Sequence, residues 1–170
     1  METVRDIIGP GLKILFIGFN PGTRSAQTGY HFAGHSNKFW KLLLASKLTP
    51  RLLRPDEDEA LLAFDYGITN IVARPTRAAS EISKDEYRKG RLILKEKLIF
   101  FSPRIACYTG IGVYKEFSAS PQISCGLQPT STIPNIADFV VPSPSGLNRI
   151  SFDEQLAFYQ RLRELAQTTQ

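Results

Sequence analysis

The chain has 170 residues, and its hydrophobic fraction of 42% and charged fraction of 22% are ordinary for a globular protein in water. No apolar run is long enough to span a membrane, and the first residues lack the apolar stretch of a secretion signal, so we expect neither a membrane protein nor a secreted one. We expect one domain over residues 1–170, monomeric, in the cytoplasm of a bacterium or the nucleus of a eukaryote.

Charge is unevenly distributed along the chain, whose formal net charge is +5. Between Ile7 and Pro55 there is no Asp or Glu, whereas the same stretch holds seven Lys and Arg residues. This stretch is either a solvated basic face or a surface that contacts the phosphates of a nucleic acid. The two cysteines and two histidines lack the spacing of a metal site, and we expect no metal.

The predicted elements begin with a buried strand over 13–18 and a long loop over 19–36. A helix capped by Ser36 or Asn37 and a second helix over 55–64 follow. A strand over 67–72 then precedes a helix over 84–101, whose start has the capping-box pattern of Ser83 and Glu86. The remaining elements are a strand over 104–109, a helix over 110–117, a Pro- and Ser-rich segment over 118–135 with a small hairpin strand, a strand over 137–141 and a helix over 152–166.

The alternation of strands and helices predicts an α/β fold with a mainly parallel sheet that is covered on both faces. In such sheets, ligands bind beyond the carboxyl ends of the strands. Three segments should therefore converge on one site: residues 19–22, the end of the strand over 67–72, and residues 142–149.

Two asparagines stand out in these segments. Asn20 lies in the sequence GFNPG, which by itself is typical of a plain turn. Asn70 lies in the strand sequence ITNIV, where Asn is unusual. The amide of Asn70 is either satisfied by neighbouring backbone groups or presented to a ligand edge with both a donor and an acceptor, such as that of a pyrimidine.

The loops hold further candidates. Phe32 either anchors its loop on the core or offers a stacking surface for a base. His31 and His35, which we expect to be exposed, are either inert or acid–base groups. The segment 143–149 is either an ordinary connection or a wedge, in which Leu147 enters a base stack and Arg149 fills the vacated place or grips phosphate.

Taken in order, these segments resemble the mismatch-specific uracil/thymine-DNA glycosylases of the uracil-DNA glycosylase superfamily. The resemblance covers nearly the whole chain and rests on six stretches of sequence: GFNPG, TGYHFAGHSNKFW, GITNIVARPT, SKDEYRKGRLIL, PRIACYTG and PSGLNR. It implies a three-layer α/β/α fold and excision of a flipped-out base without a metal or an organic cofactor. The implied partner is double-stranded DNA with uracil mismatches, and single-stranded DNA is a second expected substrate.

The resemblance also implies roles for individual residues. Asn20 would position the attacking water. The residues expected to bind the base are Gly18, Phe19, Ser25, His31, Phe32 and Asn70. The residues expected to enter or contact the DNA duplex are Ser143, Ser145, Gly146, Leu147, Asn148 and Arg149.

Two positions depart from the family pattern. Ser143 stands where related enzymes have a catalytic His or an Asn, and Ser25 stands beside the C5 side of the pyrimidine. The expected reaction is hydrolysis of the N-glycosidic bond of deoxyuridine, especially in G·U mismatches. Two rival interpretations are a mismatch-binding protein that does not cleave and a small-ligand-binding α/β domain.

Overall fold

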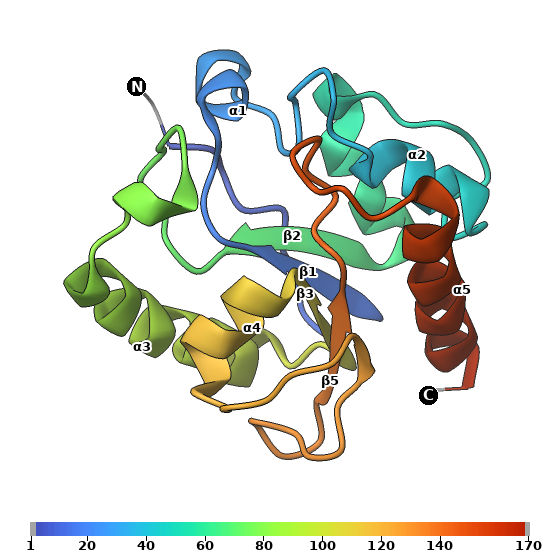
Figure 1. The fold of residues 1–170 in the computed structure, drawn as a ribbon. Coiled ribbons are helices and arrows are strands. Elements are labelled where there is room, and N and C mark those ends of the chain that lie inside the picture. Colours follow the sequence, from blue (N-terminus) through green and yellow to red (C-terminus); the bar gives the residue numbers. More distant parts are fainter. Residues whose placement is uncertain (1–2, 169–170) are drawn as a thin grey trace.

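The structure, a computed structural model that describes residues 3–168, is built on a five-stranded sheet (Figure 1). The strand order is β2-β1-β3-β5-β4. The first four strands in this order are parallel, and β4 runs antiparallel to β5. The strands are β1 (Ile14–Gly18), β2 (Tyr66–Asn70), β3 (Ile105–Thr109), β4 (Gly126–Leu127) and β5 (Ala137–Val141).

Helices cover both faces of this sheet, because alternate side chains of each strand point to opposite sides. Ile14 and Phe16 of β1 belong to one apolar cluster, and Leu15 and Ile17 belong to another. The first cluster is closed by α2 (Phe39–Ala45), η1 (Pro55–Phe64) and α5 (Phe152–Thr168). The second is closed by α3 (Lys84–Phe101) and α4 (Ile111–Ser118).

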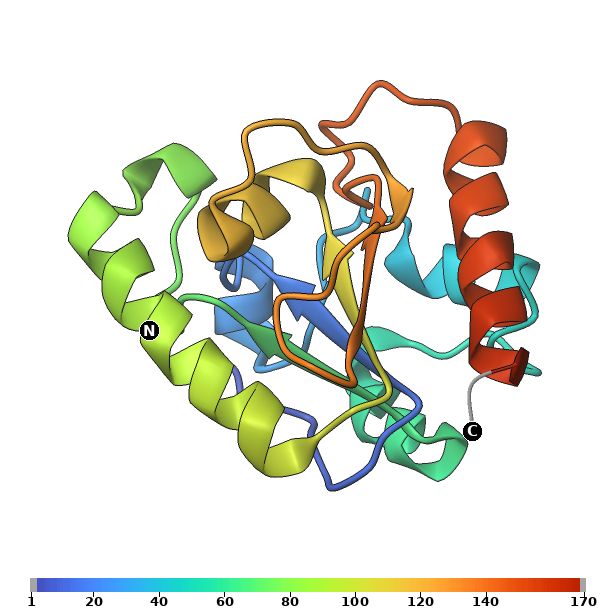
Figure 2. The ribbon, with the colours of Figure 1, turned by 90° about the horizontal axis from the view of Figure 1, so that it is seen from below.

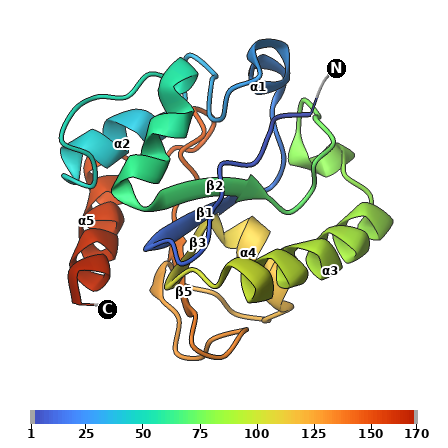
Figure 3. The ribbon, with the colours of Figure 1, turned by 180° about the vertical axis from the view of Figure 1, so that it is seen from behind.

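Figures 2 and 3 show these two helical layers on either side of the strands. All residues of β1 and β3 are buried, as a sheet covered on both faces requires. The predicted three-layer α/β/α fold with a mainly parallel sheet is therefore confirmed. No described helix is long and apolar enough to cross a membrane.

The structure differs from the predicted elements mainly in the segment 19–36, which contains the short helix α1 (Thr23–Thr28). Its sequence, TRSAQT, is polar and has no apolar periodicity, so the pattern indicated a loop. Gly29 ends α1 in the left-handed conformation, with φ of 80°, which glycine adopts without strain.

Smaller differences concern the ends of elements and their type. Helix α2 begins at Phe39, and Asn37 precedes it, with its Oδ1 accepting a hydrogen bond from the Phe39 N–H at 2.9 Å. The segment over 55–64 is a 3-10 helix. A further short 3-10 helix, η2 (Ala79–Glu81), precedes α3, which starts with the predicted capping box of Ser83 and Glu86.

Candidate active site

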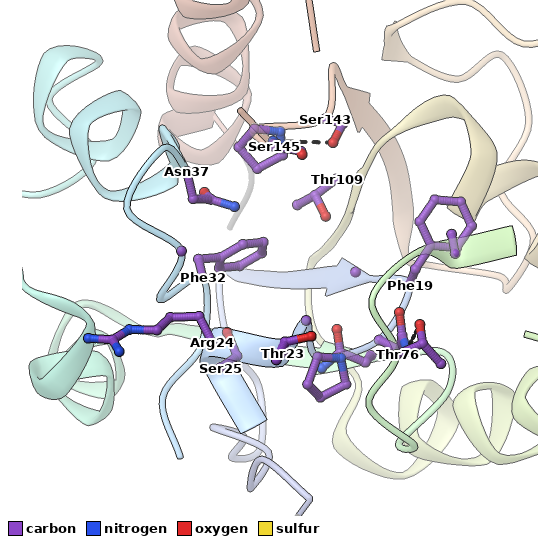
Figure 4. A pocket seen from close by; sticks show the side chains of 18 of the residues that line it. Phe19, Thr23, Arg24, Ser25, Phe32, Asn37, Thr76, Thr109, Ser143 and Ser145 are labelled. Atoms are coloured by element: carbon purple, nitrogen blue, oxygen red, sulfur yellow. Dashed lines mark hydrogen bonds between the residues drawn. The ribbon is translucent and has the colours of Figure 1, made fainter. Parts of the chain in front are cut away.

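A cavity of about 530 Å³ lies at the carboxyl ends of the parallel strands. Its walls come from residues 18–25, from the loop over 31–37, from Asn70 and residues 76–79, from Thr109, and from residues 143–147. The three segments that were predicted to converge therefore do so (Figure 4). None of the residues that line the cavity is Asp or Glu, so the groups available there are amides, hydroxyls, backbone groups, the imidazole of His31 and the guanidinium groups of Arg24 and Arg77.

The side chain of Asn20 is held in one orientation. Its Nδ2 donates to the carbonyl oxygen of Arg74 at 2.7 Å and to Oγ1 of Thr76 at 2.8 Å. Thr76 in turn donates to the carbonyl oxygen of Ala78 at 2.8 Å, so its oxygen faces Asn20 as an acceptor. Both hydrogens of the amide are thus used within the protein. The Oδ1 of Asn20 makes no hydrogen bond to the described residues and is available to a ligand or a water molecule.

The backbone that holds Asn20 is itself anchored to α3. The Arg74 guanidinium donates to the two carboxylate oxygens of Glu86 at 2.5 and 3.1 Å and to the carbonyl oxygen of Glu81 at 3.0 Å. The hydrogen bond from Arg74 lowers the pKa of Glu86 to about 2, so this carboxylate stays charged at neutral pH. The start of α3 therefore determines where the carbonyl of Arg74 lies.

Phe32 is a cavity residue whose ring is supported from behind. It stacks on Phe39, with ring centroids 4.1 Å apart and an interplanar angle of 20°. Its φ is +50°, which is uncommon for a bulky residue. The ring is half-buried and lines the cavity (Figure 4). The two interpretations of Phe32 are thus compatible, because the ring is anchored on the core and also presented to the cavity.

Asn70 ends β2 and lies opposite Gly18 in the parallel register. A Cβ atom on Gly18 would lie 2.8 Å from the Oδ1 of Asn70, so any other residue at this position would displace the amide from the place it occupies. Among the described residues, no hydrogen bond uses the side chain of Asn70. The interpretation in which backbone groups satisfy this amide therefore finds no support, and the amide is free to contact a ligand.

Phe19 lines the cavity, but its ring points away from it (Figure 4). The ring packs against the second apolar cluster, 6.2 Å from the Tyr87 ring centroid, and a Cβ on Gly112 would lie 2.6 Å from its Cζ. A contact between Phe19 and a base would therefore fall to its backbone. The base contact of Phe19 stays a prediction.

The expectation that His31 is exposed is wrong, since only 3% of the residue is exposed. Its Nε2 lies 2.7 Å from the carbonyl oxygen of Arg5, which can only accept, so Nε2 carries the hydrogen. Its backbone N–H donates to the carboxylate of Asp58 at 3.1 Å. Burial lowers the pKa of His31 and raises that of Asp58. His31 is thus a neutral residue that fastens its loop, and its predicted role in base binding remains untested.

Ser25 and Asn37 also have clear structural partners. The buried Oγ of Ser25 accepts a hydrogen bond from the Ala33 N–H at 3.2 Å, which ties α1 to the loop that carries Phe32. Asn37 uses its Oδ1 on Phe39, and its Nδ2, which has no partner among the described residues, points toward the cavity (Figure 4).

Sequence reasoning missed Asn37, Thr76 and Thr109 as cavity residues. Asn37 had been interpreted only as a helix cap, and Thr76 and Thr109 follow or end strands whose apolar character dominated the pattern. Thr109 donates to the carbonyl oxygen of Ile17 at 3.1 Å, across the β1–β3 pair. Its place at the carboxyl end of a parallel strand was the signal that could have identified it.

The segment 143–149 forms one rim of the cavity. Ser143, Ser145 and Leu147 line the cavity, and Leu147 is 90% exposed. Gly146 packs so closely on Ser36 that a Cβ atom would lie 2.1 Å from the Ser36 Oγ. Arg149 is exposed and lies outside the cavity lining. Leu147 therefore projects from the rim without packing on the core.

The basic stretch over 7–55 is partly neutralised by the acidic start of η1. Arg51 pairs with Glu57 at 3.1 Å, and Arg54 pairs with Asp56 at 3.0 Å. Arg24, Lys38 and Lys41 form no ion pair with the described residues, and Arg24 lines the cavity. The surface that could contact phosphates is thus narrower than the sequence suggested. Within residues 3–168 no group of three or more His, Cys, Asp and Glu side chains could hold a metal ion.

Comparison with known proteins agrees with this geometry. The solution NMR structure of a Methanosarcina acetivorans protein that is provisionally named a uracil DNA glycosylase shares the fold, with a TM-score of 0.60. The two sequences are 18% identical, and the match covers 95% of this chain and 98% of the other. The model of the uracil DNA glycosylase superfamily matches residues 6–167. The chain therefore belongs to the uracil DNA glycosylase superfamily.

Proposed function

We propose that this protein is a monofunctional DNA glycosylase that hydrolyses the N-glycosidic bond of deoxyuridine in DNA, with G·U mismatches as its main substrate. The observation that carries the proposal is the single cavity shared by the Asn20 amide, the Phe32 ring and the Asn70 amide. A flipped-out pyrimidine needs these three functions: a water held at its sugar, a surface for stacking and a partner for its polar edge.

Cleavage would proceed without a carboxylate. Most glycosidases use two carboxyl groups, whereas the residues that line this cavity include none. Uracil can leave as a stabilised anion that takes both electrons of the C1′–N1 bond, while the sugar develops oxocarbenium character. A water molecule held by the Oδ1 of Asn20 then forms the new C1′–O bond, and the proton that it loses passes through solvent to the uracil anion, which becomes neutral uracil. Positioning supplies much of the rate gain, because the amide is a weak base.

Asn70 would read the base. Its Nδ2 can donate to O4 of uracil and its Oδ1 can accept from N3–H, whereas cytosine presents the opposite pattern. A bidentate amide contact of this kind discriminates by about 1–3 kcal/mol. Because this contact does not involve the opposite base, we expect activity on uracil outside G·U mismatches as well.

A second candidate function is a protein that binds uracil mismatches without cleaving them. It rests on Ser143, because a neutral hydroxyl at this position is a weak donor to a departing base. Its Oγ accepts a hydrogen bond from the Ser145 N–H at 3.3 Å, so its own hydrogen remains free to donate. A serine hydroxyl in the cavity can thus stabilise the departing base, though less strongly than a charged donor would.

The test is cleavage of a G·U duplex by excess enzyme, with Asn20→Ala compared with Gln27→Ala, an exposed amide of α1 outside the cavity lining. Asn20→Ala should lower the single-turnover rate by about 10²-fold, because the water loses its anchor. Its affinity for a duplex whose deoxyuridine carries a 2′-fluoro group should stay within about twofold of wild type, since the amide contacts the water and not the DNA.

Gln27→Ala should match the wild-type protein in both measurements. A wild-type rate for Asn20→Ala would disprove the role of Asn20. Tight and specific binding of G·U duplexes by a wild-type protein that leaves no abasic sites would establish the second candidate instead.

A further inference from the structure

We propose that Asn148 is a positioning residue that holds the Leu147 wedge in its inserting conformation before DNA binds. The inference rests on the proposed function only in that the wedge is assumed to act on DNA. The segment concerned, residues 143–150, is called the wedge loop below. Sequence reasoning assigned Asn148 to DNA contact, whereas the structure shows its side chain engaged inside the wedge loop.

The Asn148 side chain joins the two ends of the wedge loop. Its Nδ2 donates to the carbonyl oxygen of Ser143 at 2.8 Å, and its Oδ1 accepts from the Ile150 N–H at 3.1 Å. Because a single planar amide makes both bonds, the two ends of the loop are held at a set separation. Leu147 lies between these two ends, and 90% of the residue is exposed.

Further hydrogen bonds complete the wedge loop from within. The Ser145 Oγ accepts from the Leu147 N–H at 3.2 Å, and the Ser145 carbonyl accepts from the Asn148 N–H at 3.0 Å. On the far side, Nε2 of the buried Gln155 donates to the carbonyl oxygen of Ile150 at 2.9 Å. The loop therefore satisfies these polar groups without help from a ligand.

The wedge loop is also joined to the loop that carries Phe32. The Lys38 N–H donates to the carbonyl oxygen of Pro144 at 2.9 Å, and Gly146 lies against Ser36. Phe32 stacks on Phe39, one residue beyond Lys38. The apolar tip that would enter the base stack and the ring that would receive the base therefore share one platform, and their separation is set before DNA is present.

A wedge loop that is ordered before DNA binds should favour cleavage only when the base must be extracted from a stack. A loop that is disordered in the free protein would lose conformational entropy on insertion, and that loss would weaken binding to paired DNA. A base that is already unpaired needs little or no wedge. Removal of the Asn148 amide should thus impair cleavage of paired uracil and spare unpaired uracil.

The first experiment measures amide hydrogen exchange in the free protein and is independent of activity. In Asn148→Ala the Ile150 amide should exchange about threefold to tenfold faster, as loss of one net hydrogen bond implies. Amides of β5 should be unchanged. Asn148→Asp keeps the acceptor for the Ile150 N–H and should retain most of the protection. Unchanged exchange at Ile150 in Asn148→Ala would overturn the proposal.

The second experiment compares single-turnover cleavage of uracil in a G·U pair and in an unpaired bubble within the same duplex. Asn148→Ala should lose about tenfold on the G·U pair and stay within about twofold of wild type on the bubble. Leu147→Ala should show the same split. The double variant should lose no more than Leu147→Ala alone, because the amide acts through the wedge. Gln122→Ala, an exposed amide outside the cavity lining, should match wild type.

The outcomes separate the two proposals. Equal losses of Asn148→Ala on both substrates, or additive losses in the double variant, would show that Asn148 does not act through the wedge. Absence of cleavage by the wild-type protein would disprove the proposed function, and the exchange of the Ile150 amide would still decide whether Asn148 orders the loop.

Discussion

At the scale of single residues, the site depends on how a weak group is oriented. No carboxylate lines the cavity, so an Asn20 amide that binds a water molecule can act only through the position of its oxygen. Its Nδ2 is held by the Arg74 carbonyl and the Thr76 hydroxyl. Rotation of the amide by 180° would set its oxygen against a carbonyl, which cannot donate. Thr76 therefore helps to fix the orientation of the Asn20 amide.

Thr76→Ala tests this role. The variant leaves Asn20 with one partner, the Arg74 carbonyl, and we expect the single-turnover rate on a G·U duplex to fall by about tenfold, as for loss of one hydrogen bond of about 1.4 kcal/mol. The affinity for the uncleavable duplex should not change. Thr76→Ser keeps the hydroxyl and should recover most of the rate. If the single-turnover rate of Thr76→Ser were no higher than that of Thr76→Ala, the loss of rate would come from altered packing and not from the missing hydrogen bond.

At the scale of elements, α3 supports the site from the far face of the sheet. Its first turn holds Arg74 through Glu86. Its middle approaches the residue that follows β2 so closely that a Cβ on Gly90 would lie 2.1 Å from the carbonyl oxygen of Ile71. Since Ile71 adjoins Asn70, the packing of α3 on the sheet also influences where the Asn70 amide lies.

Gly90→Ala should change the stability of the protein in two opposing ways. Alanine favours a helix by about 1 kcal/mol over glycine, whereas overpacking against a backbone oxygen costs about 1–3 kcal/mol. We expect the clash to win, because the helix and the sheet must separate to admit a methyl group. Urea unfolding should then show a net loss of about 1–2 kcal/mol. Lys95→Ala, at an exposed position of α3, should stay within about 0.5 kcal/mol of wild type. A stabilised Gly90→Ala would contradict the close approach.

At the scale of the whole molecule, the loop that carries Phe32 is held by segments distant in sequence. His31 joins it to the carbonyl of Arg5 near one end of the chain and to Asp58 in η1. The Trp40 indole also donates to the His31 carbonyl, at 3.3 Å. The position of Phe32 therefore depends on contacts from several parts of the fold. Because the imidazole of His31 is buried, the stability of that fold should also depend on pH.

The effect of pH on the free energy of unfolding through His31 has a definite direction. Burial lowers the pKa of His31 below its ordinary value of 6.5, so the unfolded chain takes up a proton that the folded chain resists. The free energy of unfolding should therefore fall as the pH drops below 6.5, by at most about 1.4 kcal/mol per pH unit for this group. Asp58 acts in the opposite sense, because its raised pKa makes protonation easier in the folded state.

The comparison of wild type with His31→Gln isolates this contribution. Glutamine can still donate to the Arg5 carbonyl but does not titrate. Urea unfolding between pH 5 and pH 7 should give a flatter dependence for the variant. The same slope in both proteins would mean that the imidazole is not the group responsible.

Much of the fold could be predicted because its signals are local. The apolar run of β1 and the capping box at Ser83 and Glu86 each act within a few residues, and the structure has both elements where they were expected. The helix α1 was missed because its polar sequence has no apolar periodicity, and its contact with the rest of the fold, from Ser25 to Ala33, lies outside any local pattern. The burial of His31 was missed because its partner carbonyl is 26 residues away.

The sequence by itself determined the α/β class, the order of the strands and of the longer helices, and the set of loops that meet at the carboxyl ends of the strands, since hydrophobic periodicity and caps encode these locally. Only the tertiary structure decided which way the Asn20 amide faces, that the Asn70 amide has no partner among the described residues and that the Asn148 amide is engaged within its own loop. These properties depend on contacts such as that of Asn20 with Thr76, 56 residues apart, and on close approaches like that of Asn70 to Gly18, which no local pattern specifies.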